Sequence, residues 1–385
     1  MPSPGARRPE PGARSLERSA ASGVRSSRRA AIRRRLLAWW DAGHRDLPWR
    51  FPQRAADPYR VWLAEVMLQQ TRVEAVVPYY RRFLGRFPTL EALAGAPEDE
   101  VLALWSGLGY YARARNLHRA ARTALARHGG LPAELAALRA LPGFGPYTAG
   151  AVASIAFAIP APAVDGNAAR VLSRLFLVEG DPAAAGTARR LRALAADLVA
   201  AGEGARRPGD LNQALMELGA TLCGRAPSCG RCPLAPTCGA LEAGRERELP
   251  VPRRRPRRRE LHLACALVLE RGRVLLARGR SGGLFGGLWG LPSVPLDRSA
   301  RARAALRAGI RSAHGVDLEV GRLAGEVRRA LTHRDLRLSA YRSRMQGGPG
   351  SGALRFFALS RLGGVGLPAA ARALLRASLP EAPES

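Results

Sequence analysis

The chain has 385 residues and a formal net charge of +30 at pH 7, from 61 basic and 31 acidic residues. The length predicts two or three domains, and the charge favours a solvated polyanion such as nucleic acid as the partner. The longest apolar stretch, residues 149–163, is shorter than the ~20 residues that span a bilayer, so no membrane segment is expected.

Composition divides the chain into four segments. Residues 1–29, rich in Arg, Ser, Pro and Gly and without a secretory apolar region, predict a disordered extension of a cytoplasmic, nucleoid-associated protein. Residues 30–248 show the three- and four-residue apolar spacing of helices and predict an all-helical domain. Residues 249–260, which include PVPRRRPRRR, predict an exposed linker. Residues 261–378 alternate strand and helix patterns, including a hairpin at Arg271-Gly272, and predict a small α+β domain.

PYRVWLAEVMLQQT, residues 58–71, predicts a buried helix in which Glu65 is the only ionisable group from Val61 to Leu68. Burial should raise the pKa of Glu65, which could then hold a proton near neutral pH and donate it as a general acid. A buried Glu paired with an Arg is the structural alternative, and the sequence does not separate the two.

AVDGNAARVLSRLF, residues 163–176, places Asp165 or Asn167 at the N-cap of a helix that runs from Ala168. The helix N-terminus should lower the pKa of Asp165 and keep the side chain charged. An N-cap without catalytic function is the alternative. Together, a protonated Glu65 and an ionised Asp165 would supply the acid and the anion that glycoside cleavage requires.

The sequence CGRAPSCGRCPLAPTC brings four cysteines into sixteen residues with the spacing C-x5-C-x2-C-x5-C. Thiols this close indicate a metal site, either structural zinc or an iron-sulfur cluster, and the spacing alone does not decide between them. The cysteines are Cys223, Cys229, Cys232 and Cys238. Cys265 lies apart and is interpreted as a small buried residue.

These motifs resemble the helix-hairpin-helix DNA glycosylases, and among them the MutY-type adenine DNA glycosylases. The matching motifs, in chain order, are LPWR, PYRVWLAEVMLQQT, GLGYYARARNLH, LPGFGPYTAGAV, VDGNAARVLSRLF, MELGATLC and the four cysteines. The resemblance implies a monomeric DNA-repair enzyme that hydrolyses the N-glycosidic bond of adenine mispaired with 8-oxoguanine or guanine in double-stranded DNA. It also implies a [4Fe-4S] cluster on the four cysteines, with zinc as the alternative, although the first cysteine gap is one residue shorter than is usual in the family.

The resemblance assigns roles to individual residues. Glu65 would protonate adenine N7, Asp165 would stabilise the oxocarbenium-like sugar, and Tyr147 and Asn167 would steady the catalytic site. In LPGFG, the backbone at Gly143 and Gly145 would bind a DNA phosphate. The residues that match substrate-binding positions, several of which wedge into the stack that adenine leaves, are Arg50, Leu68, Gln70, Thr71, Leu108, Tyr110 and Glu217.

In the related endonuclease III enzymes the position of Tyr147 holds a Lys that attacks the sugar and cleaves the strand. Here it is Tyr, and the whole chain contains no Lys. A lysine Schiff base is therefore impossible, and the expected activity is monofunctional base removal without efficient strand cleavage.

The second domain resembles the Nudix-like module found in these enzymes, and GGLFGGLWGLPS is its clearest match. The segment AALRAGIRSAHGV, which corresponds to the magnesium-binding helix of Nudix hydrolases, contains no carboxylate, so phosphohydrolase activity is not expected. The loop that recognises 8-oxoguanine in the family corresponds to Leu331, Thr332 and His333.

Two alternatives remain. One is an endonuclease III-like pyrimidine glycosylase, against which the missing Lys and the added domain argue. The other is a non-catalytic, metal-stapled DNA-binding protein, which would have no need for a carboxylate in apolar surroundings. The predicted fold is a multidomain chain, with an all-α helix-hairpin-helix glycosylase domain and a small α+β Nudix-like domain.

Overall fold

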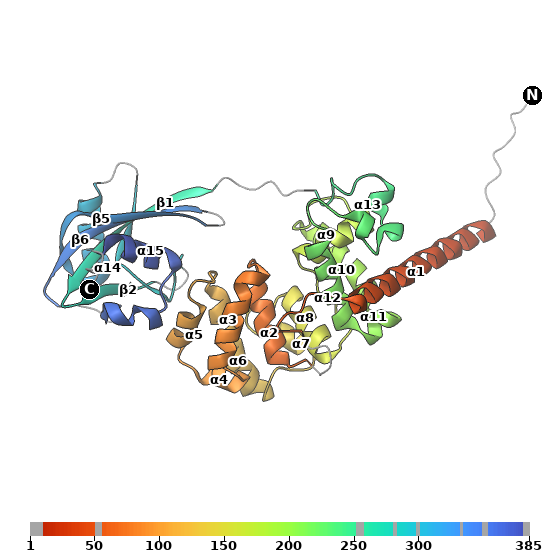
Figure 1. Cartoon of the computed structure of the whole chain (residues 1–385), viewed down its shortest axis with the longest axis horizontal. Helices are drawn as coiled ribbons and strands as arrows, with labels where there is room; N and C mark the ends of the chain where they lie inside the picture. The colour runs from red at the N-terminus through yellow and green to blue at the C-terminus, as the bar shows by residue number, and fades with distance from the viewer. Residues whose placement is uncertain are drawn as a thin grey trace, which may run out of the picture. The chain divides into compact units, whose positions relative to one another are not determined.

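The computed structural model describes residues 11–50, 56–251, 258–279, 283–297, 301–331, 334–348 and 353–379, without the side chains of residues 11–25. It has two compact units: unit 1 comprises Met1–Val66 and Leu131–Arg254, and unit 2 comprises Met67–Gly130 and Arg255–Ser385. Helices thus occur in both units (Figure 1), whereas the sequence predicted a single helical domain up to residue 248. The boundary between the two units, between Val66 and Met67, falls within helix α2.

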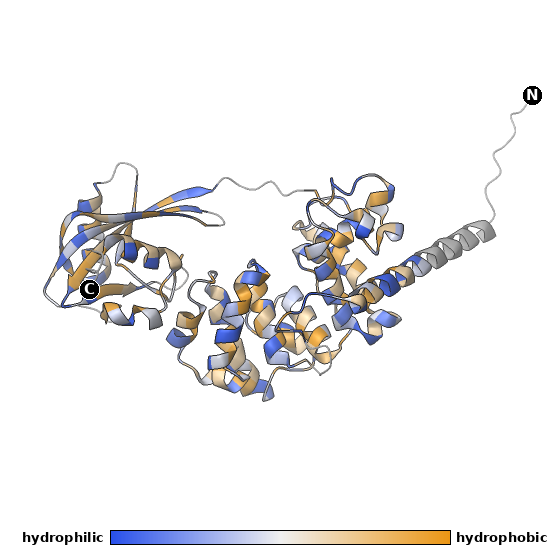
Figure 2. Cartoon of the chain, viewed as in Figure 1, coloured by the Kyte–Doolittle hydropathy of each residue, from blue (hydrophilic) through white to orange (hydrophobic). Residues whose placement is uncertain are grey.

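Unit 1 is helical. Its elements are α1 (Pro11–Ala42), α2 (Pro58–Leu68), α7 (Leu135–Arg139), α8 (Pro146–Phe157), α9 (Gly166–Leu175), α10 (Ala185–Val199), α11 (Glu203–Arg206), α12 (Pro208–Thr221), η1 (Cys229–Arg231), η2 (Ala235–Thr237) and α13 (Gly239–Glu242). Apolar side chains of α1, α9, α10 and α12, such as Leu36, Leu172 and Leu215, form one buried core. Helix α8 is apolar over most of its length (Figure 2), and every residue from Thr148 to Ser154 is buried.

The N-terminal helix differs from the prediction. Residues 1–29 were expected to be disordered, but α1 begins at Pro11. Ile32, Leu36 and Trp40 are at most 4% exposed and anchor the C-terminal half of α1 in the core. Because helix propagation is far easier than nucleation, the Ala- and Arg-rich residues before this anchor continue the same helix.

The helical part of unit 2 contains α3 (Val73–Arg86), α4 (Leu90–Gly95), α5 (Glu98–Trp105) and α6 (Ala112–His128). Its α+β part contains β1 (Arg259–Glu270), β2 (Arg273–Arg278), β3 (Trp289–Gly290), β4 (Ser293–Leu296), α14 (Ala302–His314), β5 (Asp317–Ala330), β6 (Arg334–Gln346), β7 (Leu354–Ala358), η3 (Leu359–Gly364) and α15 (Ala369–Ser378). The predicted hairpin is confirmed, since Arg271 and Gly272 join β1 to β2 with positive φ angles of 48° and 71°.

Within the described residues the strands form one mixed sheet of order β3-β2-β1-β6-β5, in which β4 also pairs with β1 and β7 with β2. Strands β1 and β6 are parallel, and the other pairs are antiparallel. Helix α14 packs with Ala264 and Val268 on one face, and α15 packs with Leu267 and Leu338 on the other. The α+β prediction is therefore confirmed.

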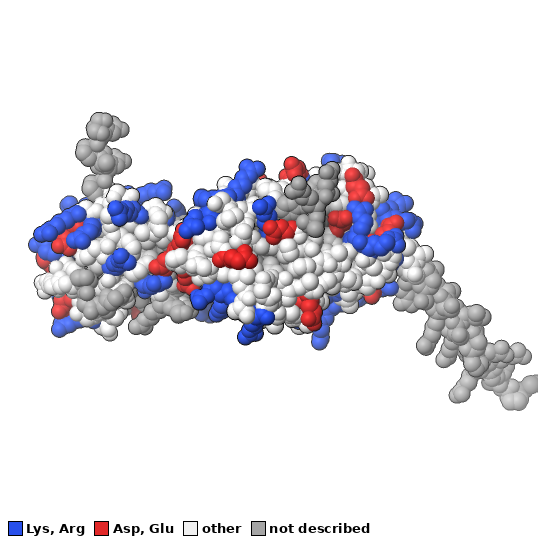
Figure 3. Space-filling view, turned by 90° about the horizontal axis from the view of Figure 1, so that it is seen from below, with Lys and Arg blue, Asp and Glu red and all other residues white. Residues whose placement is uncertain are grey.

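The chain as a whole is strongly basic, with a formal net charge of +30 at pH 7. On the face shown in Figure 3, basic side chains, all of them Arg, are spread over the described surface with acidic side chains between them. None of the described helices is long and apolar enough to cross a membrane.

Candidate active site

Glu65 is buried in the middle of α2, with 6% of its surface exposed. The hydroxyl group of Tyr147 donates a hydrogen bond to Glu65 Oε2. Burial raises the pKa of Glu65 to about 7 although the Tyr147 hydrogen bond opposes the rise; the charge of Asp165 adds to it, and the charge of Arg50 opposes it. A carboxyl group in this setting can hold a proton at neutral pH.

Tyr147 lies in the first turn of α8, which begins at Pro146 directly after the LPGFG hairpin of residues 141–145. Besides its bond to Glu65, its hydroxyl oxygen is 3.3 Å from Met216 Sδ of α12. Burial raises the pKa of Tyr147 well above its ordinary value, with further contributions from Glu65 and Asp165. Tyr147 therefore stays protonated and acts as a hydrogen-bond donor to Glu65.

The hairpin before α8 is fixed by packing. Gly143 has a φ of 79°, a backbone conformation that favours glycine. Phe144 is buried and stacks on Trp62 with 5.1 Å between ring centroids. Gly145 is the N-cap of α8 and donates its N–H to the Gly143 carbonyl at 3.2 Å. Phosphate binding at Gly143 and Gly145 stays a prediction.

Asp165 caps α9, and its carboxylate accepts from the Ala168 N–H at 2.7 Å and from Asn167 Nδ2 at 3.1 Å. The predicted N-cap is therefore present, but the predicted direction of the pKa shift was wrong. Burial raises the pKa of Asp165, and the hydrogen bonds from Ala168 and Asn167 only partly offset this desolvation. The sequence showed the cap but not how deeply the surrounding helices bury it.

A chain of hydrogen bonds continues from Asp165 to the cysteine loop. Asn167 Oδ1 accepts from Arg170 Nη2 at 2.8 Å. The same guanidinium donates to the carbonyl oxygens of Gly219 and Cys223, each at 2.7 Å. Arg170 thus fixes the orientation of Asn167 relative to α12, and sequence reasoning missed it because one Arg among so many carries no signal.

Asn212 of α12 was also missed. It is fully buried, accepts from the Ala163 N–H at 3.1 Å, and donates to the Ala161 carbonyl at 2.8 Å. These bonds hold the segment between α8 and Asp165 against α12. A single Asn in an amphipathic helix gives no sequence signal, because only the fold shows that its amide is enclosed.

Glu217 of α12 forms an ion-pair cluster with two arginines. Its carboxylate accepts from Arg45 Nε at 2.7 Å and from Arg50 Nη2 at 2.8 Å. Burial alone would raise the pKa of Glu217, but the hydrogen bonds from Arg45 and Arg50 lower it to about 2. Arg50 also lies over the Trp40 ring at 4.8 Å. Arg50 and Glu217, both predicted substrate-binding residues, are therefore in direct contact with each other.

Four predicted DNA-contacting residues lie in the loops of unit 2. Gln70 and Thr71 follow Leu68, the last residue of α2, and Leu108 and Tyr110 lie between α5 and α6. Tyr110 is 42% exposed, whereas Leu108 is only 8% exposed. Exposure of a large aromatic side chain suits a residue that contacts a base stack, but these roles stay predictions.

Thr332 and His333 lie outside the described residues. Their neighbour Leu331 packs against the core between the sheet and α15. Helix α14 corresponds to the segment in which no carboxylate was found.

The four predicted metal-ligand cysteines are free thiols. Arg174 of α9, only 3% exposed, donates to Cys223 Sγ at 3.2 Å and to the Gly224 carbonyl at 2.7 Å. Cys238 Sγ lies 3.7 Å from the Arg174 carbonyl oxygen. Cys223, Cys232 and Cys238 also pack against the core of unit 1. The cysteine loop thus folds around Arg174.

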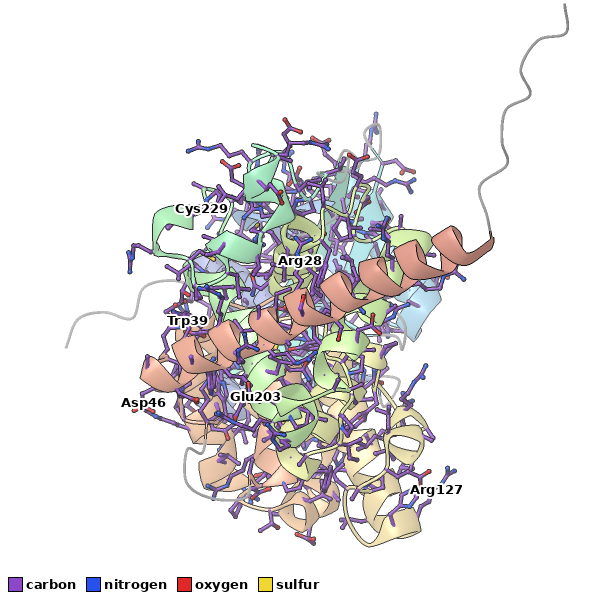
Figure 4. The ribbon with its side chains drawn as sticks, turned by 90° about the vertical axis from the view of Figure 1, so that its right-hand side faces the viewer. Arg28, Trp39, Asp46, Arg127, Glu203 and Cys229 are labelled. Carbon is purple, nitrogen blue, oxygen red and sulfur yellow. The ribbon has the colours of Figure 1, made fainter. Side chains whose placement is uncertain are left out.

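Arg28 of α1 links this loop to α9, because it donates to the Thr237 carbonyl at 2.9 Å and to the Leu175 carbonyl at 3.0 Å. Figure 4 labels Arg28 on α1 and Cys229 in the loop. In the described part of the chain, no three His, Cys, Asp or Glu side chains are arranged around one metal-ion position.

Comparisons with known proteins agree with these features. Residues 63–197 match the model of the HhH-GPD superfamily base excision DNA repair proteins, and residues 264–377 match the NUDIX domain. The chain is 40% identical to an adenine DNA glycosylase of Arabidopsis thaliana over 70% of this chain and 48% of the relative. It is 36% identical to the Homo sapiens adenine DNA glycosylase over 82% of this chain and 67% of the relative.

The chain spans about half to two thirds of the length of these relatives. A solved thermostable thymine-DNA glycosylase is 30% identical and superimposes with a TM-score of 0.49, covering 57% of this chain and 98% of its own. Glu65, Tyr147 and Asp165 lie inside the matched glycosylase segment, and the matched Nudix segment follows it in the chain. The chain belongs to the adenine DNA glycosylases of the helix-hairpin-helix superfamily.

Proposed function

We propose that this protein removes adenine from A:8-oxoguanine and A:G mispairs in duplex DNA by hydrolysing the N-glycosidic bond. Glu65 donates its proton to adenine N7, which makes the base a better leaving group. The bond between N9 and C1′ then breaks and its electron pair leaves with adenine, while Asp165 stabilises the positive charge that develops on the sugar. Water adds to C1′ and releases one proton, which restores the protonated form of Glu65. Because adenine must leave the stack to reach the buried Glu65, a mispair that lowers the cost of extrusion favours the reaction.

The observation that supports this function is the environment of Glu65. The pKa of this carboxyl is raised to about 7 by burial, Tyr147 donates to one of its oxygens, and Asp165 is close enough to raise its pKa further. A DNA-binding protein without catalysis gains nothing from a carboxyl group held in this state, because its burial lowers stability. General acid catalysis requires such a group.

The reaction is proposed to stop at base removal. The side chain that contacts Glu65 is Tyr147, whose raised pKa makes it a poor nucleophile, and the chain contains no Lys. The product is therefore an intact strand with an abasic site.

The test uses duplexes with A opposite 8-oxoguanine, A opposite G, and A opposite T, together with a thymine glycol duplex for the pyrimidine alternative. Alkali after incubation should cleave the adenine strand of the two mispairs, and omission of alkali should leave it intact. Borohydride should trap no covalent adduct. Cleavage at thymine glycol but not at the mispairs would reject the proposed function.

We further propose that Cys223, Cys229, Cys232 and Cys238 hold a [4Fe-4S] cluster. The donor set, the free thiols and the guanidinium of Arg174 beside Cys223 Sγ support it, since hydrogen bonds to ligand sulfurs are typical of such sites. When bound, the cluster would fix the loop after α12, whose carbonyl groups orient Arg170 and Arg174.

Iron and sulfide analysis of the purified full chain, with the absorbance near ~400 nm, tests this assignment. Cys232→Ser should lower the iron content and the absorbance together. Cys265→Ser is the matched control, because Cys265 is buried in the α+β core of unit 2. Stoichiometric zinc with no visible absorbance would reject the cluster.

A further inference from the structure

Two loops of unit 2 contain residues with unusual backbone conformations. Gln70, between α2 and α3, has a φ of 58°, and Tyr110, between α5 and α6, has a φ of 50°. Both are in the left-handed region, which is unfavourable for residues other than glycine and persists only where the surroundings hold it. Both also occupy positions predicted to enter the base stack.

One side chain contacts both loops. Arg113 in the first turn of α6 donates from Nη1 to the Met67 and Gln69 carbonyls at 2.9 and 2.7 Å. From Nη2 it donates to Thr71 Oγ1 and to the Gly109 carbonyl, each at 3.3 Å. Nη1 therefore binds the last turn of α2 and the loop that follows it, whereas Nη2 binds that loop and also the loop before α6.

The same guanidinium is enclosed by aromatic rings. Its carbon lies 5.4 Å from the centre of the Tyr110 ring and 5.5 Å from that of Trp105. Trp105 Nε1 also donates to the Gly109 carbonyl at 3.1 Å. Burial lowers the pKa of Arg113 to about 10, which still leaves it charged at neutral pH. A buried charge is costly unless hydrogen bonds compensate for its lost hydration. The hydrogen bonds of Arg113 are therefore needed to keep its charged guanidinium in this position.

From these contacts we infer that Arg113 is a positioning residue that holds the Gln70 and Tyr110 loops in the strained conformations needed to extrude adenine from the duplex. Arg113 itself contacts neither the base nor the sugar in this scheme. Because the planar guanidinium of Arg113 has two terminal nitrogens, Arg113 sets the distance between the two loops as well as the conformation of each loop. This inference rests on the proposed function and extends it to the extrusion step.

The activity test compares Arg113→Met, which keeps the length of the side chain but removes its donors, with Arg119→Ala. Arg119 is an exposed Arg on the same helix and donates to Asn116. Single-turnover excision is measured on A opposite 8-oxoguanine and on A opposite an abasic-site analogue, where adenine has no partner. Arg113→Met should slow the first reaction about 10-fold to 100-fold and the second about threefold or less, because extrusion is easier there. Arg119→Ala should change neither reaction.

A second readout does not depend on activity. Amide hydrogen exchange of the full chain should become faster in residues 68–71 and 107–111 in Arg113→Met, and in neither segment in Arg119→Ala. Arg113→Lys, with a single nitrogen, should keep residues 68–71 protected but release residues 107–111. Should Arg113→Met fail to fold, Arg113→Lys still tests whether both loops depend on the two terminal nitrogens of Arg113.

Two outcomes would overturn the inference: equal slowing of both substrates by Arg113→Met, or unchanged exchange in both segments. If the unmodified protein excises adenine from neither substrate, the proposed function is rejected instead. The exchange experiment would then still test whether Arg113 links the two loops.

Discussion

Replacement of Glu65 by Gln should stabilise the protein while it abolishes catalysis, and the gain should depend on pH. Between pH 4.5 and about 7, the folded protein keeps a proton on Glu65 that the unfolded chain has released, because burial raises the pKa of this group from 4.5 to about 7. Stability therefore falls as the pH rises through this window. At ~1.4 kcal/mol for each pH unit, the full loss above pH 7 is about 3 kcal/mol.

Gln is neutral at every pH and keeps an oxygen that can accept from Tyr147, so Glu65→Gln avoids this loss. Urea unfolding of the two proteins, followed by tryptophan fluorescence, should give nearly equal stabilities at pH 4.5. The variant should be more stable by about 3 kcal/mol at pH 8. A difference that does not change with pH would refute the assigned protonation of Glu65.

Glu217→Gln provides a control with the opposite sign. The pKa of Glu217 is lowered from 4.5 to about 2, since the hydrogen bonds from Arg45 and Arg50 outweigh the effect of burial. Its ionised form stabilises the fold above pH 4.5, and this contribution is lost as the pH falls toward 2. Glu217→Gln should therefore destabilise the protein at neutral pH, where Glu65→Gln stabilises it.

Three further outcomes are expected. The single-turnover excision rate should fall above pH 7 by about tenfold for each pH unit, as Glu65 loses its proton; a flat profile up to pH 9 would contradict its role as the acid. Arg170→Ala should lower that rate about 10-fold to 100-fold by freeing Asn167 beside Asp165, whereas Arg189→Ala, an exposed Arg of α10, should leave it unchanged. Gly219→Ala should lower the Tm and cost ~1–3 kcal/mol, because an added Cβ would lie 2.7 Å from both Asn167 Cβ and the Asn167 carbonyl oxygen; an unchanged thermal midpoint would contradict this close packing of α12 on α9.

Several features of the site could be predicted because they are local. An apolar helix with one carboxyl group predicts burial of Glu65, and an Asp two residues before Asn167 predicts an N-cap. The position of Tyr147 after the hairpin and the complete lack of Lys need no fold to be recognised. The hairpin between β1 and β2 follows equally from the Arg271-Gly272 turn, since it separates two short apolar runs.

Other features depend on residues far apart in the chain. Arg113, Arg170 and Arg174 look alike among the arginines of the sequence, and their roles come from the carbonyl groups that the fold places around each guanidinium. The pKa of Asp165 was predicted in the wrong direction for the same reason. Its helix cap is a local property, but its desolvation is the sum of contributions from all neighbouring elements.

The sequence by itself determined the chemistry that this protein can carry: one carboxyl group in an apolar helix, a second at a helix cap, a tyrosine where strand cleavage would need an amine, and four clustered thiols. Only the tertiary structure decided how far each group is desolvated and which arginine holds which loop. Desolvation and hydrogen-bond geometry depend on distances between segments, and no local pattern encodes those distances.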